Sequence, residues 1–221
     1  MSEILLLIII IVPIISNVIL KSTYSKYSNI ENGINMTGED AAREILNKNG
    51  LSDVKIVKTQ GFLSDHYNPK TKTVVLSEHI YSGKSIASVA VAAHEVGHAI
   101  QHKESYAFLA FRTALVPVVN FASRFSNIIL VLGLLFGAIG LINLAILLLC
   151  ISLLFQLVTL PVEFNASNRA KKQLEKIGLL EKKDEQGVNK MLKAAAFTYV
   201  ASFLASALQI LRLFLLTRDR D

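Results

Sequence analysis

One stretch of the chain, residues 128–160, contains thirty-three residues and no charged side chain. A single membrane-spanning helix needs about 20 apolar residues, so this stretch is too long for one crossing. Its middle holds residues that favour a turn, namely Gly137, Gly140 and Asn143. We therefore predict a hairpin of two transmembrane helices, with arms at about 115–140 and 141–160.

Two further apolar blocks cover residues 4–20 and 194–216. Glu3 precedes the first block, and Lys21 and Lys26 follow it. This charge order favours a retained anchor with an external N-terminus over a cleaved signal peptide. The chain as a whole is 52% hydrophobic and only 18% charged. We predict a mainly α-helical, multi-pass protein of the cell membrane with about four transmembrane helices.

The formal net charge of +6 fits a membrane protein, because such proteins keep Lys and Arg on the cytoplasmic side. Nucleic-acid binding is not expected, since no basic helix or aromatic–basic cluster stands out. Cys150 is the single cysteine of the sequence. Neither an internal disulfide nor a cysteine-based zinc cluster is therefore available.

The polar region between the anchor and the hairpin carries the signals of a small α+β unit. A helix is expected to begin after Thr37 and to end at Asn49-Gly50. The residue patterns at 54–57 and 73–76 predict two short strands. Ser85 is a suitable N-cap for a helix that continues through residues 94–98.

Residues 94–98 read His-Glu-Val-Gly-His, which is the HExxH pattern of zinc peptidases. On a helix the two imidazoles lie one turn apart on one face, where both reach the same zinc ion. The intervening glutamate reaches the attacking water instead, and serves as general base and then as general acid. We predict His94 and His98 as metal ligands, Glu95 as the catalytic residue and Zn2+ as the cofactor.

A catalytic zinc ion needs a third protein ligand. A metzincin would have Gly at position 101 and a ligating His at 104, but the chain has Gln101 and Glu104. His102 lies one turn beyond His98, too far along the helix to share the ion. After Glu104 no Asp, Glu or His occurs until Glu163. Weaker candidates lie upstream, at His66, Glu78 and His79. We predict Glu163 as the third ligand.

This ligand set requires His94 and Glu163 to lie on one side of the membrane, with an even number of crossings between them. The predicted hairpin meets that requirement. Both flanking segments are rich in Lys and Arg, which places the site at the cytoplasmic face. The chain then divides into an anchor (1–20), a catalytic region (21–113), a transmembrane hairpin (114–160), a third-ligand segment (161–193) and a C-terminal transmembrane helix with a tail (194–221).

Several stretches resemble the YugP-like neutral zinc metallopeptidases, a group of bacterial integral-membrane proteins. The matching residues are 36–38, 41–43, 63–67, 92–102, 159–164, 166–170 and 198–201. They are spread over nearly the whole chain. The resemblance implies a zinc peptidase with several transmembrane helices, and it says little about the substrate.

A more distant similarity is to the HtpX-type membrane proteases, which are gluzincins with an ExxAD motif at the third ligand. Glu163 begins the corresponding run, and Ser167 stands at the position of the Asp. Asn165 or Asn168 is the expected substitute for orienting the ligands. In such enzymes a strand just before the active-site helix binds the extended substrate. The strand at 73–76 is expected to do this here.

These observations predict a small α+β, gluzincin-like catalytic region in a membrane-embedded zinc endopeptidase. Its substrate would be a peptide or protein, associated with the membrane. One alternative is an intramembrane protease of the site-2 type, which the uncharged residues 85–93 favour and Lys103 and Glu104 disfavour. The other is a zinc-binding membrane scaffold or chaperone without turnover. Glu95 argues against it, because a structural site is more often closed by four protein ligands.

Overall fold

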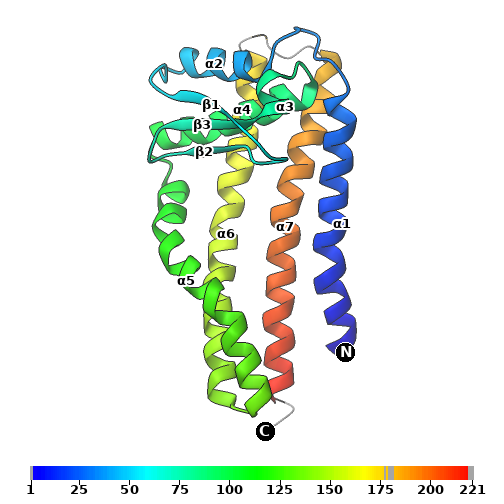
Figure 1. Ribbon diagram of the computed structural model, residues 1–221, viewed down its shortest axis with the longest axis vertical. Coiled ribbons are helices and arrows are strands. Elements are labelled where there is room, and N and C mark those ends of the chain that lie inside the picture. The colour runs from blue at the N-terminus through cyan, green and yellow to red at the C-terminus, as the bar shows by residue number, and fades with distance from the viewer. Residues whose placement is uncertain (1, 177, 179–181, 219–221) are drawn as a thin grey trace. The chain divides into compact units, whose positions relative to one another are not determined.

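The computed structural model describes residues 2–176, 178 and 182–218 (Figure 1). The chain forms two compact units. Unit 1 comprises Met1–Asn17, Ala107–Pro161 and Phe197–Asp221, and unit 2 comprises Val18–Tyr106 and Val162–Ala196. The elements, in chain order, are α1 (Ser2–Ser28), α2 (Gly38–Lys48), β1 (Lys55–Thr59), β2 (His66–Asn68), β3 (Thr73–Ser77), α3 (Glu78–Ser82), α4 (Ile86–Lys103), α5 (Ala107–Phe136), α6 (Ile139–Lys176) and α7 (Lys182–Arg218).

Four helices, α1, α5, α6 and α7, are long and apolar enough to cross a membrane. Their apolar side chains are largely exposed, as expected for helices that face lipid. The predicted mainly helical chain with about four such helices is confirmed, and so is a small sheet within it. The predicted division into five segments stays a prediction, although α6 runs without a break across its boundary at 160.

The predicted turn inside the charge-free stretch is present in unit 1. Helix α5 ends at Phe136, Gly137 follows with a φ of +63°, and α6 begins at Ile139. A Cβ built on Gly133 would lie 2.8 Å from Ile142, so the two helices touch where the chain reverses. The arms are longer than predicted, because α5 begins at Ala107 and α6 continues through Pro161 to Lys176.

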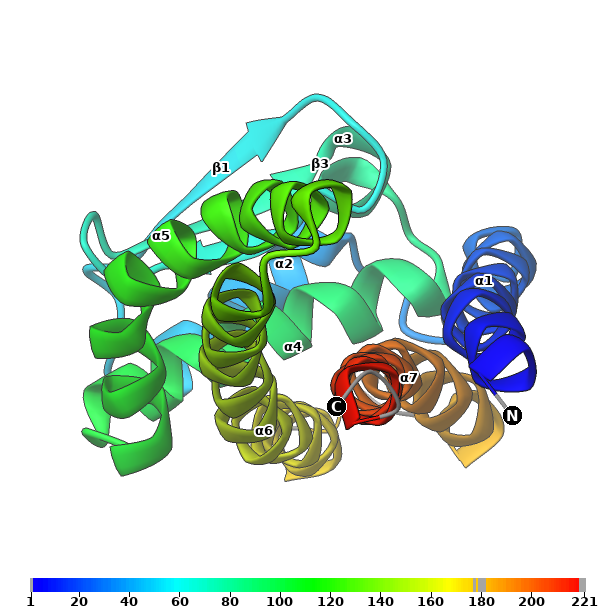
Figure 2. The same cartoon turned by 90° about the horizontal axis from the view of Figure 1, so that it is seen from below.

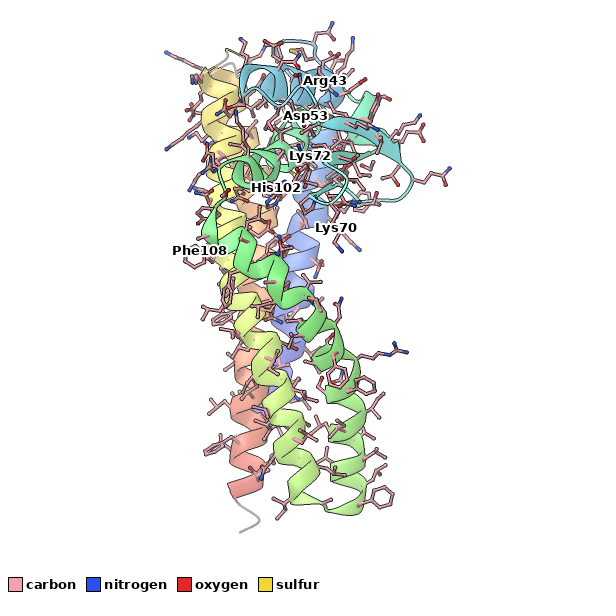
Figure 3. The ribbon with its side chains drawn as sticks, turned by 90° about the vertical axis from the view of Figure 1, so that its left-hand side faces the viewer. Arg43, Asp53, Lys70, Lys72, His102 and Phe108 are labelled. Carbon is pink, nitrogen blue, oxygen red and sulfur yellow. The ribbon has the colours of Figure 1, made fainter. Side chains whose placement is uncertain are left out.

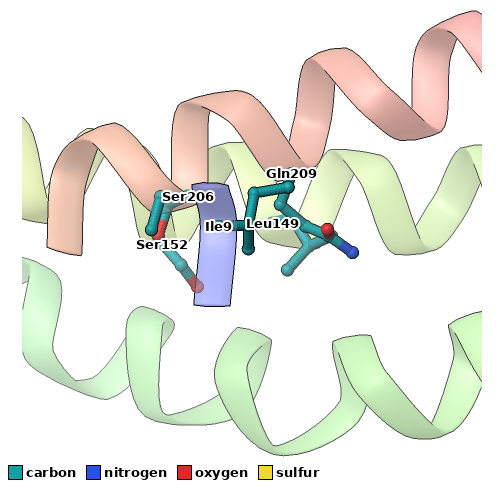
Figure 4. A pocket seen from close by; sticks show the side chains of 6 residues that line it. Ile9, Leu149, Ser152, Ser206 and Gln209 are labelled. Carbon is teal, nitrogen blue, oxygen red and sulfur yellow. The ribbon is translucent and has the colours of Figure 1, made fainter. Parts of the chain in front are cut away.

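A cavity of about 210 Å³ lies between the apolar helices of unit 1 (Figure 4). Its lining combines apolar and polar side chains, namely Ile9 of α1, Leu149 and Ser152 of α6, and Ala205, Ser206 and Gln209 of α7. These helices therefore carry hydrogen-bonding groups within otherwise apolar sequence.

Helix α2 of unit 2 begins and ends where the sequence predicts. The Thr37 hydroxyl accepts a hydrogen bond from the Asp40 backbone, and the Asp40 carboxylate accepts one from the Thr37 backbone, which forms a capping box. At the other end Gly50 has a φ of +65°, a conformation that glycine adopts without steric cost. Its N–H bonds the carbonyl of Asn47, and that of Leu51 bonds Leu46, as in a Schellman motif.

The sheet of unit 2 has the strand order β1-β3-β2. Strand β3 pairs with β1 in parallel and with β2 antiparallel. The prediction that residues 73–76 bind an extended substrate by strand addition is therefore wrong, because both edges of β3 are already hydrogen-bonded. The outer strands are β1 and β2. The short strand β2 was not predicted, since its three residues, His66–Asn68, show no apolar alternation.

Helix α4 packs against both α2 and the sheet (Figures 1 and 2). Its N-terminus is capped by Ser85, whose hydroxyl accepts from the Ser88 backbone. Most of its side chains are buried, and they form one core with Ile45 and Leu46 of α2 and with Val74 and Leu76 of β3. Helix α4 is therefore held on several sides, which fixes the direction of the His-Glu-Val-Gly-His segment.

Candidate metal centre

The three predicted metal ligands come from two helices of unit 2. His94 and His98 lie one turn apart on α4, and Glu163 lies on α6 just after Pro161. Their side chains meet although sixty-five positions separate His98 from Glu163. His98 and Glu163 are buried, and His94 is partly exposed.

Helices α4 and α6 approach each other closely at Gly97. A Cβ built on Gly97 would lie 2.6 Å from the carbonyl oxygen of Ala166, closer than real Cβ contacts. Ala166 is itself fully buried, so the side chain on the α6 side of this approach is small. The glycine of the HExxH segment is therefore required by packing, because it lets Glu163 reach the histidines.

The distances at the centre suit a tetrahedral metal ion. Glu163 Oε2 lies 3.2 Å from His94 Nε2 and 3.5 Å from His98 Nε2. One potential ligand atom from each residue lies within 4.8 Å of the others. Zinc bonds of about 2.0–2.1 Å in a tetrahedron place the ligand atoms roughly 3.3 Å apart. Two imidazoles and one carboxylate are also a donor set used by catalytic zinc, so the residues present fit the ion.

Each imidazole has a polar partner on its second nitrogen. His98 Nδ1 lies 3.0 Å from Gln101 Oε1, and His94 Nδ1 lies 3.2 Å from Ser167 Oγ. Such partners orient ligating histidines. Ser167 thus contacts a ligand itself, where an Asn had been expected to compensate for it. Asn165 bonds Gln101 rather than an imidazole, at 2.9 Å.

Gln101 is the partner that sequence reasoning missed. In the sequence it stands out only as a departure from the metzincin pattern. Its position three residues after His98, on the same helix face, was the available signal.

Glu95 is buried beside the metal ligands. Burial raises the pKa of Glu95, and the positive charges of His94 and His98 act in the opposite direction. Burial lowers the pKa of His98, but the hydrogen bond and the negative charge of Glu163 outweigh it, so that this pKa is raised. The charges of His94, His98 and Glu163 thus all act on the pKa of Glu95.

The upstream candidates for the third ligand do not join this group. His66 and His79 are exposed, and Glu78 forms an ion pair with Lys58 at 3.0 Å. His102, shown on α4 in Figure 3, is also exposed, and its Nδ1 lies 2.9 Å from the hydroxyl of Tyr67 on β2. Among the residues that the structure describes, the one such cluster around the HExxH segment consists of His94, His98 and Glu163.

Comparison with known proteins extends this picture to the whole chain. A family model described as "Putative neutral zinc metallopeptidase" matches residues 2–218. The chain belongs to this family of neutral zinc metallopeptidases. It is 48% identical over 204 residues to the "Putative membrane protease YugP" of Bacillus subtilis (strain 168), and the match covers 91% of each chain. No solved structure matches the chain. The family membership agrees with the zinc-type ligand set, and the relative's name agrees with the four candidate spans.

Proposed function

We propose that the protein is a membrane-embedded zinc endopeptidase of the gluzincin type. In this proposal His94, His98 and Glu163 hold the ion and Glu95 is the catalytic residue. The observation that carries it is the convergence of these three ligands, from two helices, around a buried glutamate. Two imidazoles and a carboxylate leave a fourth position open, as in catalytic rather than structural zinc sites.

The chemistry is divided between the ion and the protein. Zinc at this centre would supply Lewis acidity, which polarises the scissile carbonyl and makes a water molecule more acidic. Glu95 accepts the proton of the attacking water and then delivers it to the leaving amine. Its burial keeps bulk water from competing for that proton. Gln101 and Ser167 hold the two imidazoles in place while the charge at the centre changes.

Removal and return of the metal test the proposal directly. The purified protein in detergent is expected to contain one zinc ion, to cleave an unfolded membrane protein, and to stop when a chelator strips the ion. Addition of zinc should restore cleavage, because the ligands are held by the packing of α4 against α6. A protein that binds zinc and cleaves nothing would instead favour the scaffold or chaperone.

The alternative of an intramembrane protease has less support. Among the described residues, the four candidate spans do not include α4, which carries His94 and His98. Helix α4 is instead part of the core of unit 2, together with the sheet. Peptide segments close to the membrane surface are therefore the substrates that we propose.

We propose that unit 2 faces the cytoplasm. Every lysine of the chain lies in unit 2, and the excess of Lys and Arg favours the cytoplasmic side. A cysteine at Gly140, in a Cys150→Ser background, should then be labelled from outside intact cells by an impermeant thiol reagent. A cysteine at Glu44 should be labelled only after permeabilisation. The reverse pattern would place the site on the outer face.

A further inference from the structure

A chain of hydrogen bonds connects the surface of unit 2 to one of the metal ligands. It begins at the ion pair between Glu104 and Arg169, whose atoms lie 2.6 Å apart. Arg169 Nε donates to Asn165 Oδ1 at 2.6 Å, and Gln101 Nε2 donates to the same oxygen at 2.9 Å. Gln101 Oε1 then faces His98 Nδ1 at 3.0 Å. This series of hydrogen bonds thus runs from the C-cap of α4 to α6 and back to α4.

The chemistry of this chain allows only one orientation of its amides. Arg169 can only donate, so the atom of Asn165 that faces it must be the oxygen. The carbonyl of Val162 can only accept, and it lies 2.8 Å from the Gln101 side chain. Gln101 therefore turns its amide nitrogen toward both Val162 and Asn165. Its oxygen is left facing His98, because a flipped amide would set that oxygen against the Val162 carbonyl, which cannot donate.

The orientation of Gln101 determines which ring nitrogen of His98 carries a proton. Because Gln101 Oε1 can only accept, His98 Nδ1 must carry a proton and donate it. The opposite nitrogen, Nε2, is then the one directed at Glu163 and at the metal position. His94 differs in this respect. Its Nδ1 faces the hydroxyl of Ser167, which can donate as well as accept, so this contact does not select a tautomer.

We propose that Gln101 is a positioning residue that commits His98 to metal binding through Nε2, with Asn165 and the Arg169–Glu104 pair as its support. The proposal rests on the proposed zinc function of the same centre. Gln101 has no exposed surface, so water does not compete for its hydrogen bonds. His98 is thereby the pre-organised ligand, and His94 the adjustable one.

Three variants of residues in this hydrogen-bond chain separate its effect from general damage to the fold. Gln101→Leu removes every hydrogen bond of the amide at similar volume, and zinc affinity should fall about 10- to 100-fold, as for other partners of metal ligands. Asn165→Asp keeps an oxygen that accepts from both Gln101 and Arg169, so its affinity should stay near wild type. Asn165→Leu loses that oxygen and should resemble Gln101→Leu. Affinity is measured by competition with a chromophoric chelator.

A matched control lies further along α6. The side chain of Gln173 accepts a hydrogen bond from Asn49 at 3.0 Å, ten residues beyond Glu163. Gln173→Leu therefore makes the same chemical change away from the centre, and should leave zinc affinity unchanged. If it lowers affinity as much as Gln101→Leu does, the loss reflects helix packing, and the positioning role is overturned.

Nuclear magnetic resonance tests the hydrogen bonds of Gln101 separately from the proposed zinc function. In the metal-free protein the side-chain amide of Gln101 should be protected from hydrogen exchange, and in the zinc-loaded protein the Nδ1 proton of His98 should exchange slowly. Equal zinc affinity in wild type and Gln101→Leu would overturn the positioning role of Gln101 and leave the proposed enzyme function unaffected. A protected Gln101 amide in a protein that binds no zinc would support the network and reject the zinc function.

Discussion

Replacement of Glu95 by Gln is expected to abolish peptide cleavage and to leave zinc stoichiometry at the wild-type level. The amide cannot take a proton from the attacking water, and loss of a general base costs about 100- to 10,000-fold in rate. Zinc should be retained, because the ligand cluster consists of His94, His98 and Glu163. Cleavage of an unfolded membrane protein and metal content are measured on the same detergent-purified preparation.

The folded state should tolerate this change. Burial raises the pKa of Glu95, which means that its charged form is costly in the fold, and a neutral side chain of the same shape avoids that cost. Glu44→Gln is the matched control, since Glu44 lies on the surface in an i,i+4 pair with Lys48. That variant should cleave normally. Full activity in Glu95→Gln would show that Glu95 is not the general base.

The local elements were predictable because each depends on residues close together in sequence. The capping box at Thr37 and the termination at Gly50 are short-range devices, and both are present. Glu163 was identified for a different reason. No Asp, Glu or His occurs between Glu104 and Glu163, so few side chains were left that could complete a zinc site. The contact between Glu163 and the two histidines was therefore predictable from the types of residue in the sequence, although it is long-range.

The details of the centre were not predictable, because they depend on how α4 and α6 are rotated against each other. The two helices approach closely at Gly97, and there Gln101, not Asn165, faces an imidazole. The same holds for Ser167, which reaches His94 because α6 continues as a helix through Pro161. The position of the 73–76 strand was misjudged for a similar reason. A three-residue partner such as β2 gives almost no sequence signal, yet it occupies an edge of the sheet.

Loss of the Glu163 carboxylate is expected to have the largest effect on zinc affinity. In Glu163→Ala, zinc affinity should fall by more than about 100-fold, beyond the effect of losing an outer-shell partner, because a direct ligand and its charge are removed. The carboxylate is buried, and its oxygen lies within 3.5 Å of both imidazoles. Among the described residues, no further His, Cys, Asp or Glu joins this cluster. Affinity is determined by chelator competition and stoichiometry by metal analysis.

Two further variants show whether such a loss reflects ligation. Glu175→Ala removes an exposed acid from the same helix, where it pairs with Lys171, and should keep zinc. Asp65 is partly buried and, like Glu163, acts electrostatically on Glu95. Its carboxylate accepts hydrogen bonds from the backbone and hydroxyl of Ser77. Asp65→Asn should therefore also retain the ion. Full zinc occupancy in Glu163→Ala, combined with loss in Asp65→Asn, would assign the third ligand to Asp65. Loss of zinc in Glu163→Ala, with zinc retained in Asp65→Asn, would assign the third ligand to Glu163. Metal binding would then depend on α6, the helix that carries Glu163 to α4.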